Sequence, residues 1–119
     1  MQDERYPKSD TPSIFGILEA ARNYRAGSPG KKATLLALLE RMGDHGGEWS
    51  CFPSQATLAH DTEQSVRTVR RHLDDLVEAD IIAVRSRVVG PDKKGNAYVL
   101  NLAALSGSAV ILSAGEGTP

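Results

Sequence analysis

Residues 65–80, SVRTVRRHLDDLVEAD, place three arginines near the start of a helical pattern and four acids toward its end. An arginine side chain offers a planar set of donors that suits phosphate groups and guanine edges. Charges in this order oppose the helix dipole, at a cost of about 0.3 kcal/mol or more for each exposed charge. Local helix physics does not account for the arginines, whereas a polyanion bound to the N-terminal half would.

A helix over residues 65–79, with Ser65 as its N-cap, is predicted because apolar residues recur there at helical spacing: Val66, Val69, Leu73 and Leu76. At about 100° per residue, Arg67 and Arg71 share the side of this helix that lies opposite the apolar stripe. Two like charges four residues apart repel each other. Phosphates or guanine edges would relieve that repulsion and convert it into binding.

A second interpretation of these charges needs no partner. Arg70 and Asp74 stand four residues apart, as do Arg71 and Asp75, so ion pairs along the helix would simply stabilise a solvated face. A charge run taken alone usually has that role. The elements around residues 65–79 therefore decide between the two interpretations.

Helices are predicted within residues 11–27, 28–43, 53–62 and 65–79, and strands within 48–52, 81–89 and 97–102. Thr11, Ser28 and Ser54 are suitable N-caps, while Gly27 and Gly43 are suitable stops for the first two helices. Residues 90–96, GPDKKGN, predict the turn of a β-hairpin. The order is helix, helix, short strand, helix, tight turn, helix and hairpin.

The predicted core is mostly aliphatic, because aromatic residues make up 5% of the chain. Its expected members are Ile14, Ile17, Leu18 and Ala21 in the first helix, Leu35, Leu36, Leu39 and Met42 in the second, and Val84, Val88 and Val99 in the hairpin. Trp49 and Phe52 flank the short strand, and packing in the core is favoured for both over base stacking.

The run FPSQATLAHDTEQSVRTVRRHLDDLVEADII, residues 52–82, resembles the winged helix-turn-helix domains of bacterial, phage and plasmid proteins. The resemblance covers residues 28–102. It implies a mainly α fold with a small antiparallel β-hairpin. In that fold the second helix of the pair enters the major groove of double-stranded DNA, and the hairpin is the wing.

The expected DNA contacts come from the last helix with its cap, from the preceding helix and turn, and from the hairpin. They are Ser65, Arg67, Thr68, Arg70 and Arg71, then Gln55 and Gln64, then Arg85, Arg87, Lys93 and Lys94. The glutamines and Thr68 are equally suited to capping or to a plain surface role. The lysines also suit any exposed hairpin turn.

The chain departs from the family pattern in two places. In the tight turn Glu63 and Gln64 stand where glycine and then an aliphatic residue are usual, and Asp80 stands where glycine commonly closes the last helix. A glycine in the turn allows a positive φ, which costs a non-glycine residue about 1 kcal/mol, so a turn of a different shape is an open alternative. Glu63 also adds a negative charge close to any bound phosphate.

Composition excludes several classes of protein. The 119 residues suit one small domain, and the net charge of −1 excludes a uniformly basic coat but not a polarised surface. Cys51 is the only cysteine, so no intrachain disulfide forms and a reducing compartment fits. No apolar run approaches the ~20 residues of a membrane helix. A cytoplasmic protein without a membrane span is therefore expected.

No catalytic, metal or cofactor site is predicted. The spacing of His45, His60 and His72 fits no metal-ligand motif, and Cys51 has no neighbouring ligand. Nucleophile elbows, phosphate loops and metal-binding helices are absent from the sequence. The chain is therefore expected not to be an enzyme, and no small-molecule ligand is inferred.

The leading hypothesis is sequence-specific binding of double-stranded DNA by a transcriptional regulator. The resemblance also allows a plasmid or phage replication or maintenance protein that binds origin repeats, and a winged-helix adaptor between proteins is a third possibility. Residues 1–10 are expected to form a flexible tail, 11–105 the winged helix-turn-helix domain with an extra N-terminal helix, and 106–119 a Gly/Ser-rich C-terminal tail. A homodimer is possible through Ile14, Phe15 and Leu18 or through residues 109–112, although both segments would equally cap the monomer core.

Overall fold

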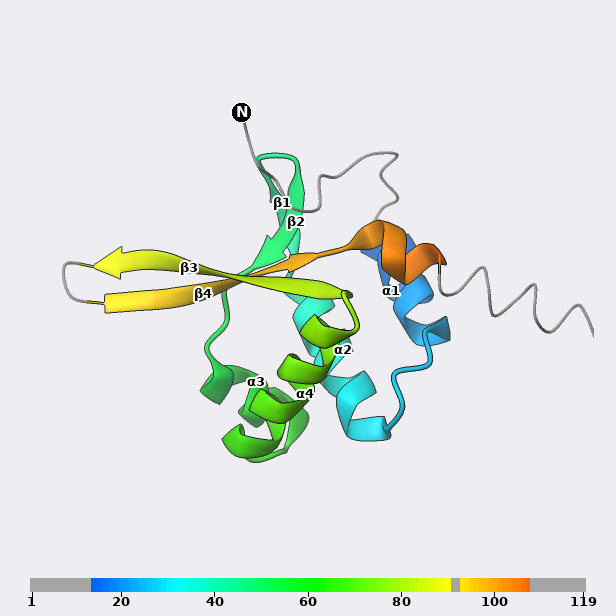
Figure 1. Ribbon diagram of the computed structural model, residues 1–119, viewed down its shortest axis with the longest axis horizontal. Coiled ribbons are helices and arrows are strands. Elements are labelled where there is room, and N and C mark those ends of the chain that lie inside the picture. Colours follow the sequence, from blue (N-terminus) through cyan, green and yellow to red (C-terminus); the bar gives the residue numbers. More distant parts are fainter. Residues whose placement is uncertain (1–13, 91–92, 108–119) are drawn as a thin grey trace, which may run out of the picture.

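A computed structural model describes residues 14–90 and 93–107, with side chains over 14–86 and 95–107. The elements are α1 (Ile14–Asn23), α2 (Pro29–Glu40), β1 (Gly43–His45), β2 (Glu48–Cys51), α3 (Gln55–Thr62), α4 (Val66–Glu78), β3 (Ile82–Gly90) and β4 (Lys93–Leu100), followed by a short helix at residues 102–107. Figure 1 shows the β3–β4 hairpin projecting well past the helices.

The strands form one antiparallel sheet in the order β1-β2-β4-β3. The β3–β4 hairpin follows α4 directly, with Val84 opposite Tyr98. β2 joins this hairpin along β4, where Ser50 lies opposite Val99. A mainly helical chain that ends in a small antiparallel hairpin is the predicted fold, a winged helix-turn-helix, and the prediction is confirmed.

Serine side chains cap the N-termini of three of the helices, as predicted. Ser28, Ser54 and Ser65 each accept a hydrogen bond from the backbone N–H three residues further on, at 3.2, 3.0 and 3.0 Å. Each bond satisfies a donor that the first helical turn leaves free, and such a cap stabilises a helix by about 1 kcal/mol. The caps therefore fix where α2, α3 and α4 begin.

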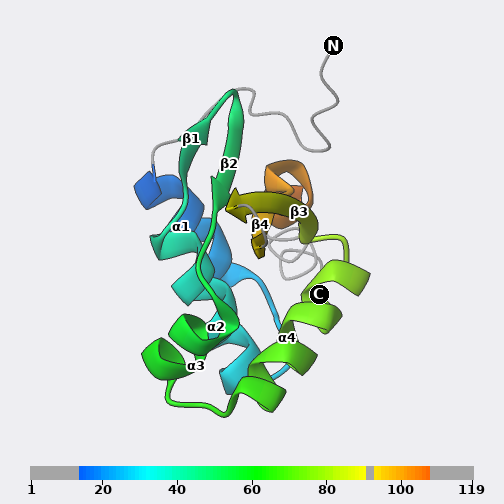
Figure 2. The ribbon, with the colours of Figure 1, turned by 90° about the vertical axis from the view of Figure 1, so that its left-hand side faces the viewer.

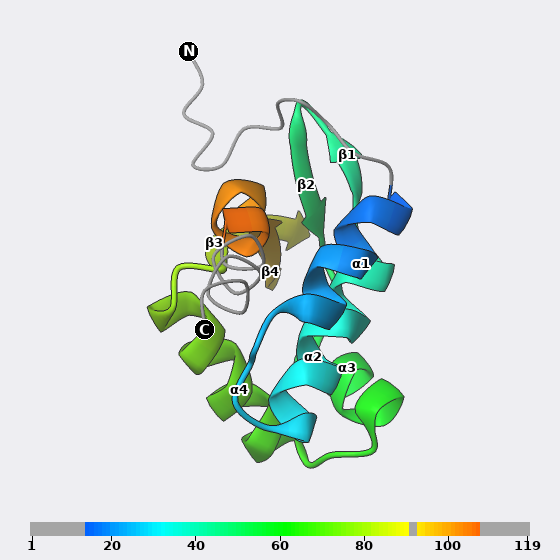
Figure 3. The same cartoon turned by 90° about the vertical axis from the view of Figure 1, so that its right-hand side faces the viewer.

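A side chain from α2 caps the end of α1, which lies alongside α2 (Figure 3). Nζ of Lys32 donates hydrogen bonds to the carbonyl oxygens of Ala21, Arg22 and Tyr24. The ammonium group lies at the negative pole of the α1 dipole, where a cation is stabilising. Burial and, to a smaller extent, the charge of Arg25 lower the pKa of Lys32.

The core lies between α2, α4 and the sheet. Its fully or almost fully buried side chains include Leu35, Leu38 and Leu39 of α2, Val69, Leu73 and Leu76 of α4, and Tyr98 and Leu100 of β4. Ile17 and Ala21 of α1 are also buried, as predicted. Burial of each large aliphatic side chain contributes about 1.5–3 kcal/mol, so this cluster holds the rear face of α4 in place.

Two residues predicted in the core are exposed instead, namely Phe52 by 42% and Val84 by 44%, and Val66 of the predicted apolar stripe is exposed by 39%. Val66 is the first residue of α4, at the free end of the stripe. Val84 lies on the edge strand β3. The ring of Phe52 packs edge-on against His45, with centroids 5.1 Å apart.

The burial of two further residues, Leu36 and Trp49, differs from the predicted core. On α2, Leu38 is fully buried, whereas Leu36 is only partly buried. Trp49 is likewise partly buried and packs against the core from β2. The side chain of Val88 lies outside the described residues, so its predicted burial stays a prediction.

Two predicted boundaries are wrong. α2 ends at Glu40 rather than at Gly43, because Gly43 pairs with Ser50 and begins β1. β4 begins at Lys93, so residues 93–96, which were expected in the turn, extend the strand. Cross-strand pairing decides both boundaries, and residue preferences for strands depend on that context.

The helix at residues 102–107 has no counterpart among the predicted elements. Asn101 Oδ1 accepts a hydrogen bond from the Ala104 N–H at 3.1 Å, and Asn101 Nδ2 donates one to the Asp80 carbonyl oxygen at 2.8 Å. Leu105 is fully buried and anchors this helix, so helical structure continues past residue 105, the expected end of the domain. The predicted tail at 1–10 and the segment 109–112 lie outside the described residues.

The turn between α3 and α4 places a non-glycine residue in a left-handed conformation. Glu63 has φ 57° and ψ 42°, in the left-handed region. Asp80, after α4, has φ 65°. The backbone N–H of Gln64 donates to the carbonyl oxygen of Ala59 at 3.0 Å and closes the turn.

Glycine in place of Glu63 is expected to raise the free energy of unfolding by about 0.5–1 kcal/mol, because glycine adopts this φ without a steric penalty. Urea denaturation measures the change. Glu63→Ala is the matched control, since it removes the same carboxylate but keeps the Cβ. An equal rise in both variants would assign the effect to charge and contradict the backbone explanation.

Candidate nucleic-acid interface

Arg67 and Arg71 lie on the exposed side of α4, opposite the buried stripe, as predicted. Within the described part of the chain, neither guanidinium makes a hydrogen bond or an ion pair. Figure 2 shows α3 and α4 at the end of the molecule remote from the β1–β2 hairpin, with the tight turn between them. Two like charges one helical turn apart therefore face solvent without compensation.

The ion pairs that would neutralise α4 along its own length do not form among the described residues. Arg70 Nε donates instead to Gln55 Oε1 on α3, over 3.4 Å. Asp75 lies 3.4 Å from Nζ of Lys31 on α2. One acid of α4 thus pairs with a neighbouring helix, and no ion pair among the described residues neutralises Arg67 or Arg71.

Gln64 occupies the centre of the tight turn and is tied to two helices. Its Nε2 donates to Oγ1 of Thr34 at 3.0 Å and to Oγ1 of Thr62 at 2.8 Å. Gly30 on α2 permits this approach, since a Cβ there would lie 2.5 Å from Gln64 Oε1. The amide that was predicted as a DNA contact is thus already engaged within the protein.

Thr34 is a residue that the sequence predictions missed. It is fully buried, and its hydroxyl donates to the Gly30 carbonyl oxygen at 2.9 Å. A threonine inside the apolar run TLLALL of α2 is the signal that was available, because a buried hydroxyl requires a hydrogen-bond partner.

Ser65 and Thr68 have a local role at the start of α4. The Ser65 hydroxyl, besides capping the helix, donates to Thr68 Oγ1 at 2.9 Å. This pair sets the first turn of the helix and therefore the direction of Arg67, which stands between the two residues. Their predicted contacts with DNA stay predictions.

Arg85 of β3 makes an ion pair that the sequence did not indicate. One of its terminal nitrogens lies 2.6 Å and 2.8 Å from the two carboxylate oxygens of Glu48 on β2. The Glu48 side chain is 8% exposed and that of Arg85 50%. Most of the charge of Arg85 therefore compensates a buried carboxylate, which would otherwise be costly.

For the remaining basic residues of the hairpin, the strand register gives the backbone positions. Arg87 lies opposite Gly95, Lys94 opposite Val88, and Lys93 opposite Gly90 at the end of the β3–β4 ladder. Lys93 and Lys94 are strand residues rather than residues of the turn. Their side chains and that of Arg87 lie outside the described residues, so their contacts with DNA stay predictions.

A groove of about 400 Å³ separates α4 from the hairpin. Val77 and Val84 line it together with Arg70 and Asp74, and Tyr98 contributes to its lining. The Tyr98 hydroxyl is buried and makes no hydrogen bond within the described residues. The groove thus combines one acid, several apolar groups and the guanidinium of Arg70, whereas Arg67 and Arg71 lie outside its lining.

Residues 28–82 match a family model that is described as a helix-turn-helix domain. This segment is a helix-turn-helix domain. The match begins at Ser28, the N-cap of α2, and ends at Ile82, the first residue of β3. No curated protein and no solved structure matches the chain significantly.

The helix-turn-helix domain is a DNA-binding fold, in which the second helix of the pair lies in the major groove. In this domain α3 and α4 are the pair, and α4 is the second helix. The family match therefore indicates DNA as the partner. α1 and most of the β3–β4 hairpin lie beyond the matched residues.

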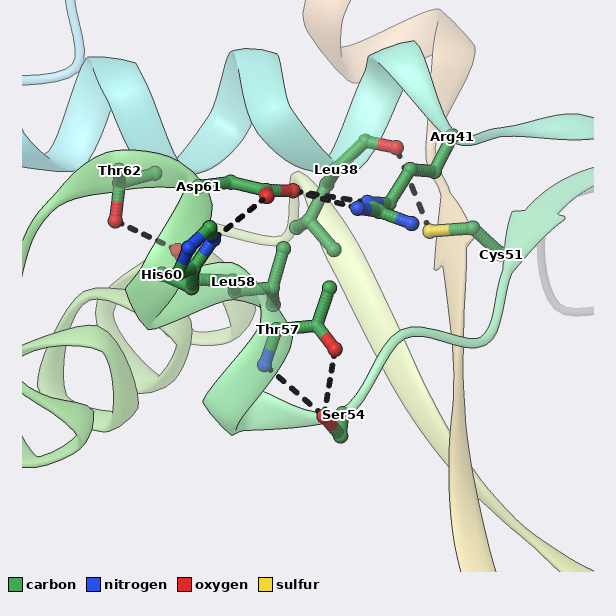
Figure 4. A network of polar contacts seen from close by, with 9 residues as sticks. All are labelled: Leu38, Arg41, Cys51, Ser54, Thr57, Leu58, His60, Asp61 and Thr62. Atoms are coloured by element: carbon green, nitrogen blue, oxygen red, sulfur yellow. Dashed lines mark hydrogen bonds and ion pairs between the residues drawn. The ribbon is translucent and has the colours of Figure 1, made fainter.

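A polar network fixes α3 of the helix-turn-helix domain against α2 (Figure 4). Arg41 Nε and Nη2 donate to Asp61 Oδ2 at 3.1 and 2.7 Å. This bond, with a smaller contribution from His60, lowers the pKa of Asp61. The Thr62 hydroxyl donates to the Leu58 carbonyl oxygen at 2.7 Å and supports the last turn of α3.

Burial shifts the pKa values of the Cys51 thiol and the His72 ring in the helix-turn-helix domain. The buried thiol of Cys51 donates to the Leu38 carbonyl oxygen at 3.4 Å, and burial raises its pKa to about 12, which keeps it protonated. Burial, together with the charges of Lys31 and Arg71, lowers the pKa of His72. Among the described residues, no group of three or more His, Cys, Asp or Glu residues is placed to hold a metal ion.

Over the part of the chain that the structure describes, every helix is too short or too polar to cross a membrane.

Proposed function

We propose that this protein binds double-stranded DNA sequence-specifically and acts as a transcriptional regulator. In this proposal α4 enters the major groove and its N-terminal half contacts the bases. The observation that supports it most directly is the pair Arg67 and Arg71, which are exposed and lack any compensating group among the described residues. DNA supplies the phosphates and guanine edges that this pair lacks in the free protein.

The distribution of charge along α4 supports the same orientation. All three arginines lie in the first half of the helix and its acids lie in the second half. This order disfavours the isolated helix, because its first turn is already the positive pole of the dipole. In a complex the arrangement brings cations to DNA and keeps most of the acids at the far end of α4.

The hairpin extends the proposed footprint as a wing that contacts phosphates. Arg87, Lys93 and Lys94 belong to its strands. A flexible ammonium group suits a phosphate, whereas base readout favours the planar guanidinium. Arg85 contributes less in this proposal, because Glu48 already binds it.

A homodimer is part of the proposal, since one recognition helix covers few base pairs and a two-fold site doubles the contact. Phe15 on α1 is 77% exposed, and Ile14 and Leu18 beside it are only partly buried. This apolar patch lies outside the matched helix-turn-helix segment, so a second copy bound there would leave α4 free for DNA.

Selection of bound sites from random duplex DNA tests the proposal. An enriched sequence is expected, and its affinity should fall steeply as salt rises, because phosphate contacts release counterions. Light scattering of the protein free and on the selected duplex gives the stoichiometry. No enrichment together with a flat salt dependence would favour the protein–protein adaptor, and a monomer in both states would remove the dimer from the proposal.

A further inference from the structure

Val66 is an apolar residue in an unexpected position. It is the first residue of α4, directly after the Ser65 cap, and it is 39% exposed rather than part of the buried stripe. A β-branched side chain is a poor helix former, and the first turn of a helix favours acids. Neither helix stability nor core packing therefore accounts for a half-exposed valine here.

Arg70 lies one helical turn further along the same flank of α4. At about 100° per residue, positions four apart on a helix lie nearly one above the other. Nε of Arg70 is held by Gln55 Oε1, and its terminal nitrogens make no hydrogen bond within the described part of the chain. This flank thus presents an apolar group and a fixed guanidinium with free donors.

The major-groove edges of the bases define what such a flank would recognise. Guanine offers two acceptors, N7 and O6, that suit an arginine. The apolar group on these edges is the C5-methyl of thymine, for which small apolar side chains are the usual contact. A half-exposed valine gains from burial against that methyl and has nothing to offer the polar edges.

We propose that Val66 is a specificity-determining residue that contacts the C5-methyl group of a pyrimidine, which is thymine in unmodified DNA. The proposal rests on the proposed function, because it requires α4 in the major groove. Four residues of helix rise about 6 Å, and successive bases on one strand are about 3.4 Å apart. The thymine therefore lies within about two base pairs of the guanine that Arg70 contacts.

Removal of single methyl groups from the selected duplex tests this contact. Each thymine is replaced in turn by uracil, which differs only by the missing C5-methyl. At one position the parent protein is expected to lose about fourfold in affinity, equivalent to ~0.8 kcal/mol for one buried methyl group. Val66→Ala should bind the thymine and uracil duplexes at that position equally well.

Val77→Ala is the matched control, because Val77 is also on α4 and is 40% exposed, but near the other end of the helix. This variant should keep the parent's preference for thymine over uracil. Val66→Thr keeps the shape of valine. Thermal unfolding of each variant separates a lost contact with DNA from a lost fold. Cytosine and 5-methylcytosine at the same position show whether the methyl group itself or the whole thymine is recognised.

The outcomes distinguish a failure of the Val66 contact from a failure of the proposed DNA-binding function. If the protein selects a sequence but no uracil substitution distinguishes the parent from Val66→Ala, the valine contact is wrong and the proposed function stands. If 5-methylcytosine recovers the affinity that cytosine loses, the methyl group is the recognised feature. If no duplex is selected at all, the proposed function fails and this inference fails with it.

Discussion

Alanine in place of Arg67 or Arg71 is expected to weaken specific DNA binding by about 1–3 kcal/mol each, if each side chain reaches a guanine edge. Both guanidinium groups are free of internal partners among the described residues, so their loss breaks no contact that the structure describes. The fold should therefore survive, and relief of the repulsion along α4 should leave stability unchanged or slightly higher. Titration of the selected duplex against each variant measures the change.

Arg22→Ala is the control for this prediction. Arg22 is an exposed arginine on α1, outside the matched helix-turn-helix segment. Its loss changes the net charge by the same amount but should leave specific affinity almost unchanged. If Arg67→Ala and Arg71→Ala bind like the parent, the recognition face has been assigned to the wrong side of α4.

Salt titration of the same variants separates two kinds of contact. An arginine that binds a phosphate should lower the salt slope by about one unit when it is removed and weaken binding to all sequences alike. An arginine that reads a guanine should instead relax the preference at one base pair. The comparison therefore reports what each side chain touches as well as how much it contributes.

Alanine in place of Leu76 is expected to lower the free energy of unfolding by about 2–5 kcal/mol. The Leu76 side chain is 1% exposed and belongs to the stripe that packs α4 into the core. Removing it leaves a cavity between closely packed helices, and its cost adds to that of the lost burial. Urea denaturation followed by circular dichroism measures the loss.

Val77→Ala is the neighbouring control for Leu76, since Val77 is 40% exposed on the same helix. A change within about 0.5 kcal/mol is expected there. Folded Leu76→Ala protein should bind the selected duplex with nearly the parent's affinity, because the exposed face of α4 is intact. A similar loss of stability in both variants would contradict the packing of α4 described here.

Much of the fold followed from patterns within a few residues of each other. Ser28, Ser54 and Ser65 cap the helices that were predicted to start there. The helical spacing of Val69, Leu73 and Leu76 likewise agrees with their burial on α4. These features depend on backbone geometry and on helical periodicity, which act locally.

Elements held by pairing between distant segments were not predictable in the same way. β1 consists of Gly43–His45, which has no intrinsic preference for a strand and exists because it pairs with β2. The early start of β4 and the helix at 102–107 depend similarly on β3 and on the buried Leu105. In each case the partner, rather than the segment, decides the structure.

By itself the sequence determined that arginines gather at the start of one amphipathic helix within a helix-turn-helix, because composition and periodicity are local properties. The tertiary structure decided which polar groups are still available to DNA. Gln64 and Arg85 are bound by Thr34 and Glu48, which lie 30 and 37 residues away along the chain. Arg67 and Arg71 form no ion pair in the described part of the fold, where Asp75 pairs with Lys31 of α2 instead. A partner so remote in sequence is invisible to any local pattern, since only the packed core brings the two segments together.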